Sequence, residues 1–282
     1  MSAPVTVTIR PDSNRLRDEL LNVWQYRDLV ALLVRRDFLA RYKQTVLGPA
    51  WFVLQPLLMT AVFTVVFGVV AGLPTDGLPP TLFYLCGQLG WNYFAQNFGA
   101  TSTTLVSNAA LFSKVYFPRL VVPVAAVLSN LFAFGLQLAT FAVVFLHFKY
   151  ALGSRAFAAG WRVLFLPLLV LQIVALSMGV GLLMSAATAK YRDLTHLTGL
   201  LIQVWMYATP VIYPLRSFPA DWQWVVALNP MTAIVESFRL VLLGTGTVWA
   251  AHLACSVAVT LALLTAGVLA FERTQRSFVD IA

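Results

Sequence analysis

Six long apolar runs constrain the fold of this chain more than any other feature. A helix that crosses the roughly 30 Å hydrocarbon core of a bilayer needs about 20 predominantly apolar residues. The candidates lie at residues 49–71, 80–102, 119–146, 161–187, 196–214 and 247–271. Only 11% of the residues are charged, well below the roughly 25% of an average soluble domain. The runs therefore predict an all-α integral membrane protein with six transmembrane helices.

Two of the six runs contain polar or helix-breaking residues. The polar residues of the second are Gln88, Asn92, Gln96 and Asn97, and the fifth contains Gln203, Pro210 and Pro214. Polar groups in hydrocarbon need hydrogen-bond partners, so both segments are expected to face protein or water over part of their length.

The distribution of Lys and Arg predicts the orientation. Six crossings put both termini on one side, and cytoplasmic termini place fourteen of the nineteen basic residues in the cytoplasm. Cytoplasmic loops of membrane proteins carry such an excess. A net charge of +8 could also indicate nucleic acid, but the basic residues lie at the ends of apolar runs, so no nucleic-acid partner is expected.

Residues 1–48 are predicted to form a cytoplasmic N-terminus, and residues 49–282 the transmembrane domain. Residues 14–24 place Leu16, Leu20 and Trp24 on one helical face, and residues 27–43 mix apolar and charged side chains. Such a pattern is typical of a helix, or a helix pair, in the headgroup layer. The alternatives of a simple anchor and of a substrate-contacting element remain open.

The segment between the fifth and sixth runs is too apolar for an ordinary loop. Asn229 and Pro230 form a helix start, and Gly244 a helix stop. The enclosed helix is too short to cross the membrane, so residues 217–244 are predicted to form a re-entrant pair of short helices on the outer side. Glu236 and Arg239, three residues apart, are expected to pair.

The chain lacks any visible energy source. None of its four lysines follows a glycine, so no phosphate-binding loop of the GxxxxGK[ST] type exists, and no carboxylate lies inside a predicted span except at its rim. The Cys and His residues show no metal-ligand spacing, so no metal is expected. We therefore expect a non-enzymatic subunit that a partner drives.

An apolar segment on the predicted cytoplasmic face could receive that partner. Residues 103–118, "TTLVSNAALFSKVYFP", form either an interfacial helix resting on lipid or a coupling element. The candidate contact residues are Asn108, Leu111, Phe112, Lys114 and Phe117.

Several stretches, in order, resemble the membrane subunits of ABC exporters of polysaccharides, which include O-antigen, capsule and teichoic-acid permeases. They are "RRDFLARYKQTVLGPAWFVLQPLL" from Arg35, "LFSKVYFPRLVVP" from Leu111, "KYRDL" from Lys190, "NPMTAIVESFRLVLLG" from Asn229 and the C-terminal "FERTQRSFVDIA". The first two stretches are most similar in sequence to the O-antigen type. Capsule and teichoic-acid export are close alternatives.

The resemblance implies a homodimer in the bacterial inner membrane, bound to two separately encoded ABC ATPase subunits. Those subunits would use ATP and Mg²⁺, and this chain would bind no cofactor itself. The implied cargo is a lipid-linked polysaccharide that moves outward from the cytoplasm. A small-molecule or lipid exporter, a membrane-embedded glycan enzyme and a scaffold are the remaining alternatives.

Three groups of residues are candidates for contact with such a cargo. Arg36, Arg41 and Lys43 lie where phosphates of a lipid carrier would approach, although snorkelling to bulk lipid is the alternative. Polar and aromatic stripes form a predicted polymer path, with interhelical packing as the alternative; its residues are Tyr84, Gln88, Asn92, Gln96, Gln203 and Tyr207, with Val211 extending the second stripe. Asn229, Pro230, Glu236 and Arg239 form a predicted outer gate.

Overall fold

The computed structural model describes residues 23–42, 45–115, 117–151, 160–191 and 193–278, and these residues contain helices and no strands. Among these described residues, four helical runs are long and apolar enough to cross a membrane: Gly48–Val70, Val121–Ala151, Trp161–Lys190 and Ala250–Gln275. They confirm the helices predicted for the first, third, fourth and sixth spans. A bent helix pair, Asp221–Ala227 with Pro230–Leu243, is a fifth candidate.

The first of these runs is not uniform. The short 3-10 turn η1 (Gly48–Ala50) leads into α3 (Trp51–Phe63), which continues as the π-helical segment η2 (Thr64–Val70). Gly48 has a φ of 51°, a conformation that side chains with a Cβ rarely adopt. Gly48 and Pro49 therefore form the turn between the N-terminal region and the first span.

Helix α4 (Pro80–Ser102) has the boundaries predicted for the second span and lies at the centre of the bundle. Its 23 residues rise about 34 Å at 1.5 Å per residue, long enough to cross. Its amides make it less apolar than the four spanning runs, and protein surrounds it instead of lipid. All residues from Leu82 to Trp91 are buried.

The predicted fifth span, 196–214, is wrong in its extent. Helix α9 (Leu194–Tyr207) has only 14 residues, about 21 Å of rise, and the chain then continues without a regular helix. Pro210 has no N–H for a helical hydrogen bond. At the end of α9, a side chain also bonds the backbone: the Thr209 hydroxyl donates to the Trp205 carbonyl at 2.8 Å. Val211 therefore does not extend the stripe of Gln203 and Tyr207.

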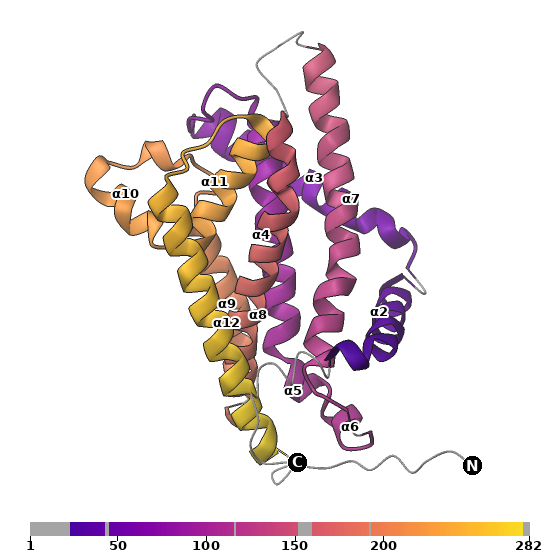
Figure 1. The fold of residues 1–282 in the computed structure, drawn as a ribbon. Coiled ribbons are helices and arrows are strands. Elements are labelled where there is room, and N and C mark those ends of the chain that lie inside the picture. The colour runs from indigo at the N-terminus through magenta and orange to yellow at the C-terminus, as the bar shows by residue number, and fades with distance from the viewer. Residues whose placement is uncertain (1–22, 43–44, 116, 152–159, 192, 279–282) are drawn as a thin grey trace.

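The remaining long helices pack on either side of α4 (Figure 1). Helix α7 (Val121–Ala151) contacts one side and α8 (Leu166–Lys190), which follows the 3-10 turn η3 (Trp161–Phe165), contacts another. Helix α12 (Ala250–Phe278) packs on the far side of α8. Figure 1 places α12 and α7 on opposite flanks of the bundle.

Glycines allow α8 to approach both neighbours closely. A Cβ on Gly179 would lie 2.6 Å from the Leu264 backbone nitrogen, and one on Gly267 would overlap the Gly179 carbonyl oxygen. A Cβ on Gly181 would overlap the Thr101 hydroxyl. Small residues at helix contacts are typical of membrane bundles, because packing and not hydrophobic burial holds helices together in lipid.

Helix α2 (Arg27–Tyr42) confirms a helix over the predicted region 27–43. Val30 and Leu33 are buried against the first turns of α7, at Val121 and Ala125. Leu29, Val34 and Phe38 are half-buried beside them, and the exposed face of the helix carries most of its charged residues. The amphipathic stretch predicted at 14–24 lies, apart from its last two residues, outside the described residues.

The predicted pair of short helices is present as α10 (Ala220–Ala227) and α11 (Pro230–Leu243), bent by 95°. The Asn229 side chain accepts a hydrogen bond from the Met231 N–H at 3.0 Å, and Gly244 has a left-handed φ of 75°. Both predicted helix limits are confirmed. Figure 1 shows this pair at the opposite end of the bundle from the short helices α5 (Thr104–Ser107) and α6 (Ala109–Phe112).

Candidate functional site

A large polar-lined cavity lies where α3, α4, α7 and α9 meet. Its volume is about 890 Å³, and amide side chains from three helices line it. These amides are Gln55 of α3, Gln88, Asn92 and Gln96 of α4, and Asn130 and Gln137 of α7. Aromatic rings of Trp51, Phe52 and Trp91 line the same space. We refer to this cavity, with its lining residues, as the amide groove.

The amide groove is open at the surface of the single chain. Leu58 and Val62 of α3 line it and are 56% and 53% exposed. By contrast, Gln88 is almost fully buried and its Nε2 donates to the Thr60 hydroxyl of α3 at 3.3 Å. The Asn130 Nδ2 donates to Asn97 Oδ1 at 2.9 Å and joins α7 to α4. Some amides of the groove therefore hold helices together, as the packing alternative predicted, while Asn92 and Gln96 remain partly exposed.

The structure brings together half of the predicted polymer-path residues. Gln88, Asn92 and Gln96 share the groove, whereas Tyr84 is fully buried with its ring 6.1 Å from that of Phe63. Gln203 and Tyr207 are exposed on α9, which contributes Ile202 and Met206 to the groove in their place.

Sequence reasoning missed Gln55, Asn130 and Gln137. The sequence signal that could have found them is that each of these amides interrupts an otherwise apolar predicted span. A periodicity within one helix shows which residues share its face but not which other helix faces them. Only the packing of α3 and α7 against α4 brings the three amides to the same cavity.

The predicted gate residues Glu236 and Arg239 form a buried ion pair. Arg239 Nη1 lies 2.8 Å from Glu236 Oε1, and both side chains are at most 1% exposed. The other Arg239 amino group, Nη2, donates to the Val211 carbonyl at 2.9 Å, and the guanidinium lies 3.9 Å from the centre of the Phe83 ring. The pair therefore fixes α11 against α4 and against the chain that follows α9.

The Glu236 carboxylate also holds two loop segments. It accepts hydrogen bonds from the Leu215 N–H at 3.3 Å and from the Thr247 N–H at 2.8 Å. The expected pairing of Glu236 with Arg239 is confirmed, and the backbone contacts extend it. The pair is a structural connection among four segments.

Asn229 makes a second set of contacts between the same segments. Besides capping α11, its Oδ1 accepts from Trp205 Nε1 of α9 at 2.9 Å. Its Nδ2 donates to the Ala208 carbonyl at 3.1 Å and to the Thr209 hydroxyl at 2.9 Å. Pro230 is buried at the first position of α11. The predicted gate residues thus attach α11 to the end of α9.

The predicted coupling residues divide into packed and exposed groups. Phe117 is buried, its ring lies 5.8 Å from that of Phe112, and both belong to the cluster that packs α2 on α7. Leu111 packs against the same cluster. Asn108 donates to the Thr104 carbonyl at 3.0 Å, whereas Lys114 is exposed. Neither Phe112 nor Phe117 can insert into another protein without leaving this cluster.

The predicted headgroup residues are only partly described. Arg36 is exposed and pairs with the neighbouring Asp37, its Nη2 lying 2.8 Å from Oδ1. The side chain of Arg41 and the whole of Lys43 lie outside the described residues. Within the described ranges, no three His, Cys, Asp or Glu side chains gather as metal ligands. The absence of a cofactor stays a prediction.

The helical architecture of the described residues, with four or five candidate spans, defines a multi-span membrane protein. The sequence profile of the ABC-2 type transporter family matches residues 28–243. This match covers most of the chain, so the protein belongs to the ABC-2 type transporter membrane family.

The chain is similar to three curated proteins, each named "O-antigen export system permease protein RfbA". The one from Myxococcus xanthus is 30% identical over 260 residues, which cover 92% of this chain and 96% of that protein. One from Klebsiella pneumoniae is 27% identical over 213 residues, covering 75% and 79%. Another from Klebsiella pneumoniae is 26% identical over 254 residues, covering 90% and 95%.

Proposed function

We propose that this chain is the membrane subunit of an ATP-driven exporter that moves a lipid-linked, O-antigen-like polysaccharide across the bacterial inner membrane. The similarity to O-antigen export permeases over nearly the whole chain carries this proposal. The amide groove supports it independently. Sugars offer hydroxyl groups to amides and apolar C–H faces to aromatic rings, and the groove presents both kinds of side chain.

The proposed topology has six crossings with both termini in the cytoplasm. Helix α4 supplies the second crossing, and α9 with the irregular chain after it supplies the fifth. The bias of Lys and Arg supports this orientation, as does the position of α2, α5 and α6 at one end of the bundle. The α10 and α11 pair at the opposite end would then be the outer re-entrant pair.

The proposed assembly is a homodimer in which a second copy covers the amide groove. Unpaired amides facing lipid tails are costly, because hydrocarbon offers them no hydrogen-bond partner. Leu58 and Val62 are exposed beside those amides and would pack against the second copy. The two grooves would then face each other and form one path.

A separate ABC ATPase would supply the energy, using ATP and Mg²⁺. Its contact would lie on the segment from α5 to Phe117, through the exposed Lys114 and Val115. Phe112 and Phe117 would transmit motion to α2 and α7, since they pack on both. Arg36, Arg41 and Lys43 would meet the phosphates of the lipid carrier near the start of the path.

Deletion of the gene tests the proposal. We expect lipid-linked glycan to accumulate inside the cell and the surface polysaccharide to be lost, and the intact gene should restore export. Unchanged surface polysaccharide would refute the proposed function. Loss of a capsule or teichoic acid with intact O-antigen would assign the chain to one of those exporters.

A further inference from the structure

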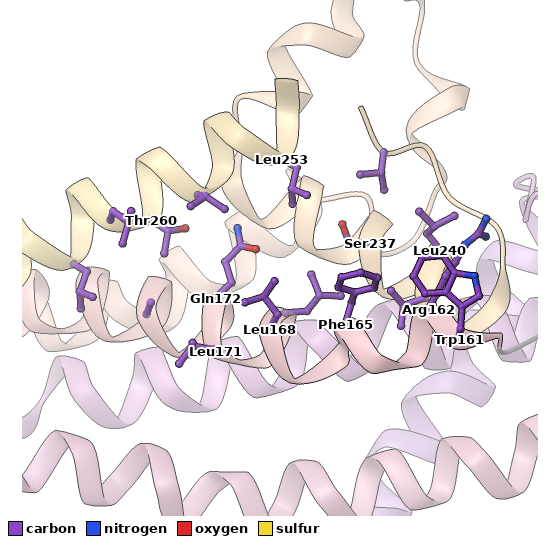
Figure 2. A pocket seen from close by; sticks show the side chains of 17 residues that line it. Trp161, Arg162, Phe165, Leu168, Leu171, Gln172, Ser237, Leu240, Leu253 and Thr260 are labelled. Atoms are coloured by element: carbon purple, nitrogen blue, oxygen red, sulfur yellow. The ribbon is translucent and has the colours of Figure 1, made fainter. Parts of the chain in front are cut away.

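A second cavity, separate from the amide groove, lies between α8, α11 and α12 (Figure 2). Its volume is about 740 Å³, and apolar side chains form almost all of its wall. Small-molecule sites typically have volumes of roughly 300–1,000 Å³. We refer to this cavity as the lateral groove. Neither the family assignment nor the proposed path accounts for it.

The lateral groove opens where α8 and α12 separate. Gly179 and Gly267 bring the two helices together at one level, and Leu264, next to that crossing, lines one end of the groove. Toward the start of α8, Leu168 and Leu171 line the groove and are each 62% exposed. Large exposed apolar side chains along two candidate membrane spans place this opening toward lipid.

Gln172 and Thr260, two polar residues of the wall, both form hydrogen bonds with Ser256. Gln172 Nε2 donates to the Ser256 hydroxyl at 2.8 Å, which donates to the Pro230 carbonyl at 2.8 Å. The Thr260 hydroxyl donates to the Ser256 carbonyl at 2.7 Å. These donors are used inside the protein, so the groove offers an occupant mainly apolar contact. The hydrogen bonds from Gln172 to Ser256 and from Ser256 to Pro230 also join α8 and α12 to the start of α11.

One end of the lateral groove carries a positive charge beside an aromatic ring. Arg162 is the only charged residue in the described lining, and it is exposed beside Trp161, which is 71% exposed. Within the described part of the chain, no ion pair joins Arg162 to a carboxylate. Both residues lie in the first turn of a candidate span. Trp and Arg at such positions lie at the level of lipid headgroups.

The length of the groove corresponds to one leaflet. From Arg162 to Ala175 the chain rises about 20 Å at 1.5 Å per residue. One leaflet with its headgroup layer contributes about 20–22 Å, half of the roughly 40–45 Å thickness of the whole bilayer. An acyl chain beginning at Arg162 would therefore reach the closed end of the groove. A helix of roughly 10 Å diameter that crosses the full bilayer would extend far beyond it.

We propose that the lateral groove binds one acyl chain of an anionic phospholipid, with Arg162 contacting its phosphate. The bound lipid fills the space between α8 and α12 and thereby supports the start of α11. Under the orientation proposed above, this lipid belongs to the outer leaflet. The site does not depend on which cargo the protein exports.

Native mass spectrometry of the purified full-length assembly tests this site. The probes are dioleoyl phosphatidylglycerol and its zwitterionic counterpart, dioleoyl phosphatidylcholine, added to the detergent-solubilised protein. We expect one phosphatidylglycerol per chain to be retained under activation that removes phosphatidylcholine. Arg162→Gln should weaken this retention about tenfold, the effect of losing one charge-assisted hydrogen bond.

Two further variants separate a specific site from the surrounding lipid. Leu168→Trp fills the groove and should abolish retention, whereas Val143→Trp, at a similarly exposed position on the opposite flank, should leave it unchanged. Retention unaffected by Leu168→Trp would overturn the proposal. So would equal retention of both lipids with no effect of Arg162→Gln, or a change of oligomeric mass in Leu168→Trp, which would assign the groove to a second copy.

Discussion

The buried pair of Glu236 and Arg239 gives the sharpest stability prediction. Truncation of one partner of a buried ion pair typically costs about 3–5 kcal/mol, because the other charge is left unpaired. Replacing both with apolar residues of similar volume is often neutral or stabilising. The perturbations are Glu236→Leu, Arg239→Met and the double variant.

The neighbours of each buried charge predict that the two single variants lose different amounts of stability. Glu236→Leu leaves Arg239 fully buried with the Val211 carbonyl and the Phe83 ring as neighbours. An arginine does not release its proton in a protein, so we expect a loss of about 4–5 kcal/mol. Arg239→Met leaves Glu236 with two backbone donors. Because these N–H groups still bond the carboxylate, we expect a smaller loss, about 3 kcal/mol.

Equilibrium unfolding in mixed micelles with rising SDS fraction measures these free energies. The double variant should lose about 2–4 kcal/mol, because the Leu215 N–H and the Val211 carbonyl lose their buried partners, which is still less than the sum of the two single losses. Single variants that each lose less than about 1 kcal/mol would refute the reasoning. A double variant as unstable as the sum would also refute it, because the two charges would then act independently.

Three further variants test other parts of the structure. Gly179→Ala should cost about 1–3 kcal/mol, because its Cβ would meet the Leu264 backbone, whereas Gly135→Ala, with no atom within 4 Å, should be neutral in the same unfolding assay. Asn229→Ala should cost about 2 kcal/mol, more than an ordinary helix cap, since it also leaves the Trp205 N–H without its partner; a loss below about 0.5 kcal/mol would contradict this. Gln96→Trp should reduce export several-fold without loss of stability by narrowing the amide groove, and the Leu131→Trp control on α7 should export normally.

Local sequence signals predicted some elements well. The cap at Asn229 and the stop at Gly244 depend on the conformational preferences of single residues, and both are confirmed. The length of the apolar runs predicted the helices of four spanning segments, because hydropathy is a property of each segment alone.

Features that depend on contacts between segments were not accessible in this way. The stripe through Val211 was wrong because Pro210 ends the helical pattern and the Val211 carbonyl is recruited by Arg239. Tyr84 lies on the predicted helical face, but packing against Phe63 removes it from the groove. Gln137 lines the groove only because α7 packs beside α4, which no pattern within α7 encodes.

The central claim is that this chain is a path without its own energy source, driven by a partner ATPase. Reconstitution in vesicles that contain lipid-linked polysaccharide measures it directly, with a probe that detects glycan reaching the opposite leaflet. We predict transfer only when the chain, its ATPase, ATP and Mg²⁺ are all present, and none with an ATPase that binds but does not hydrolyse ATP. Sustained transfer by the chain alone, without nucleotide, would contradict the claim.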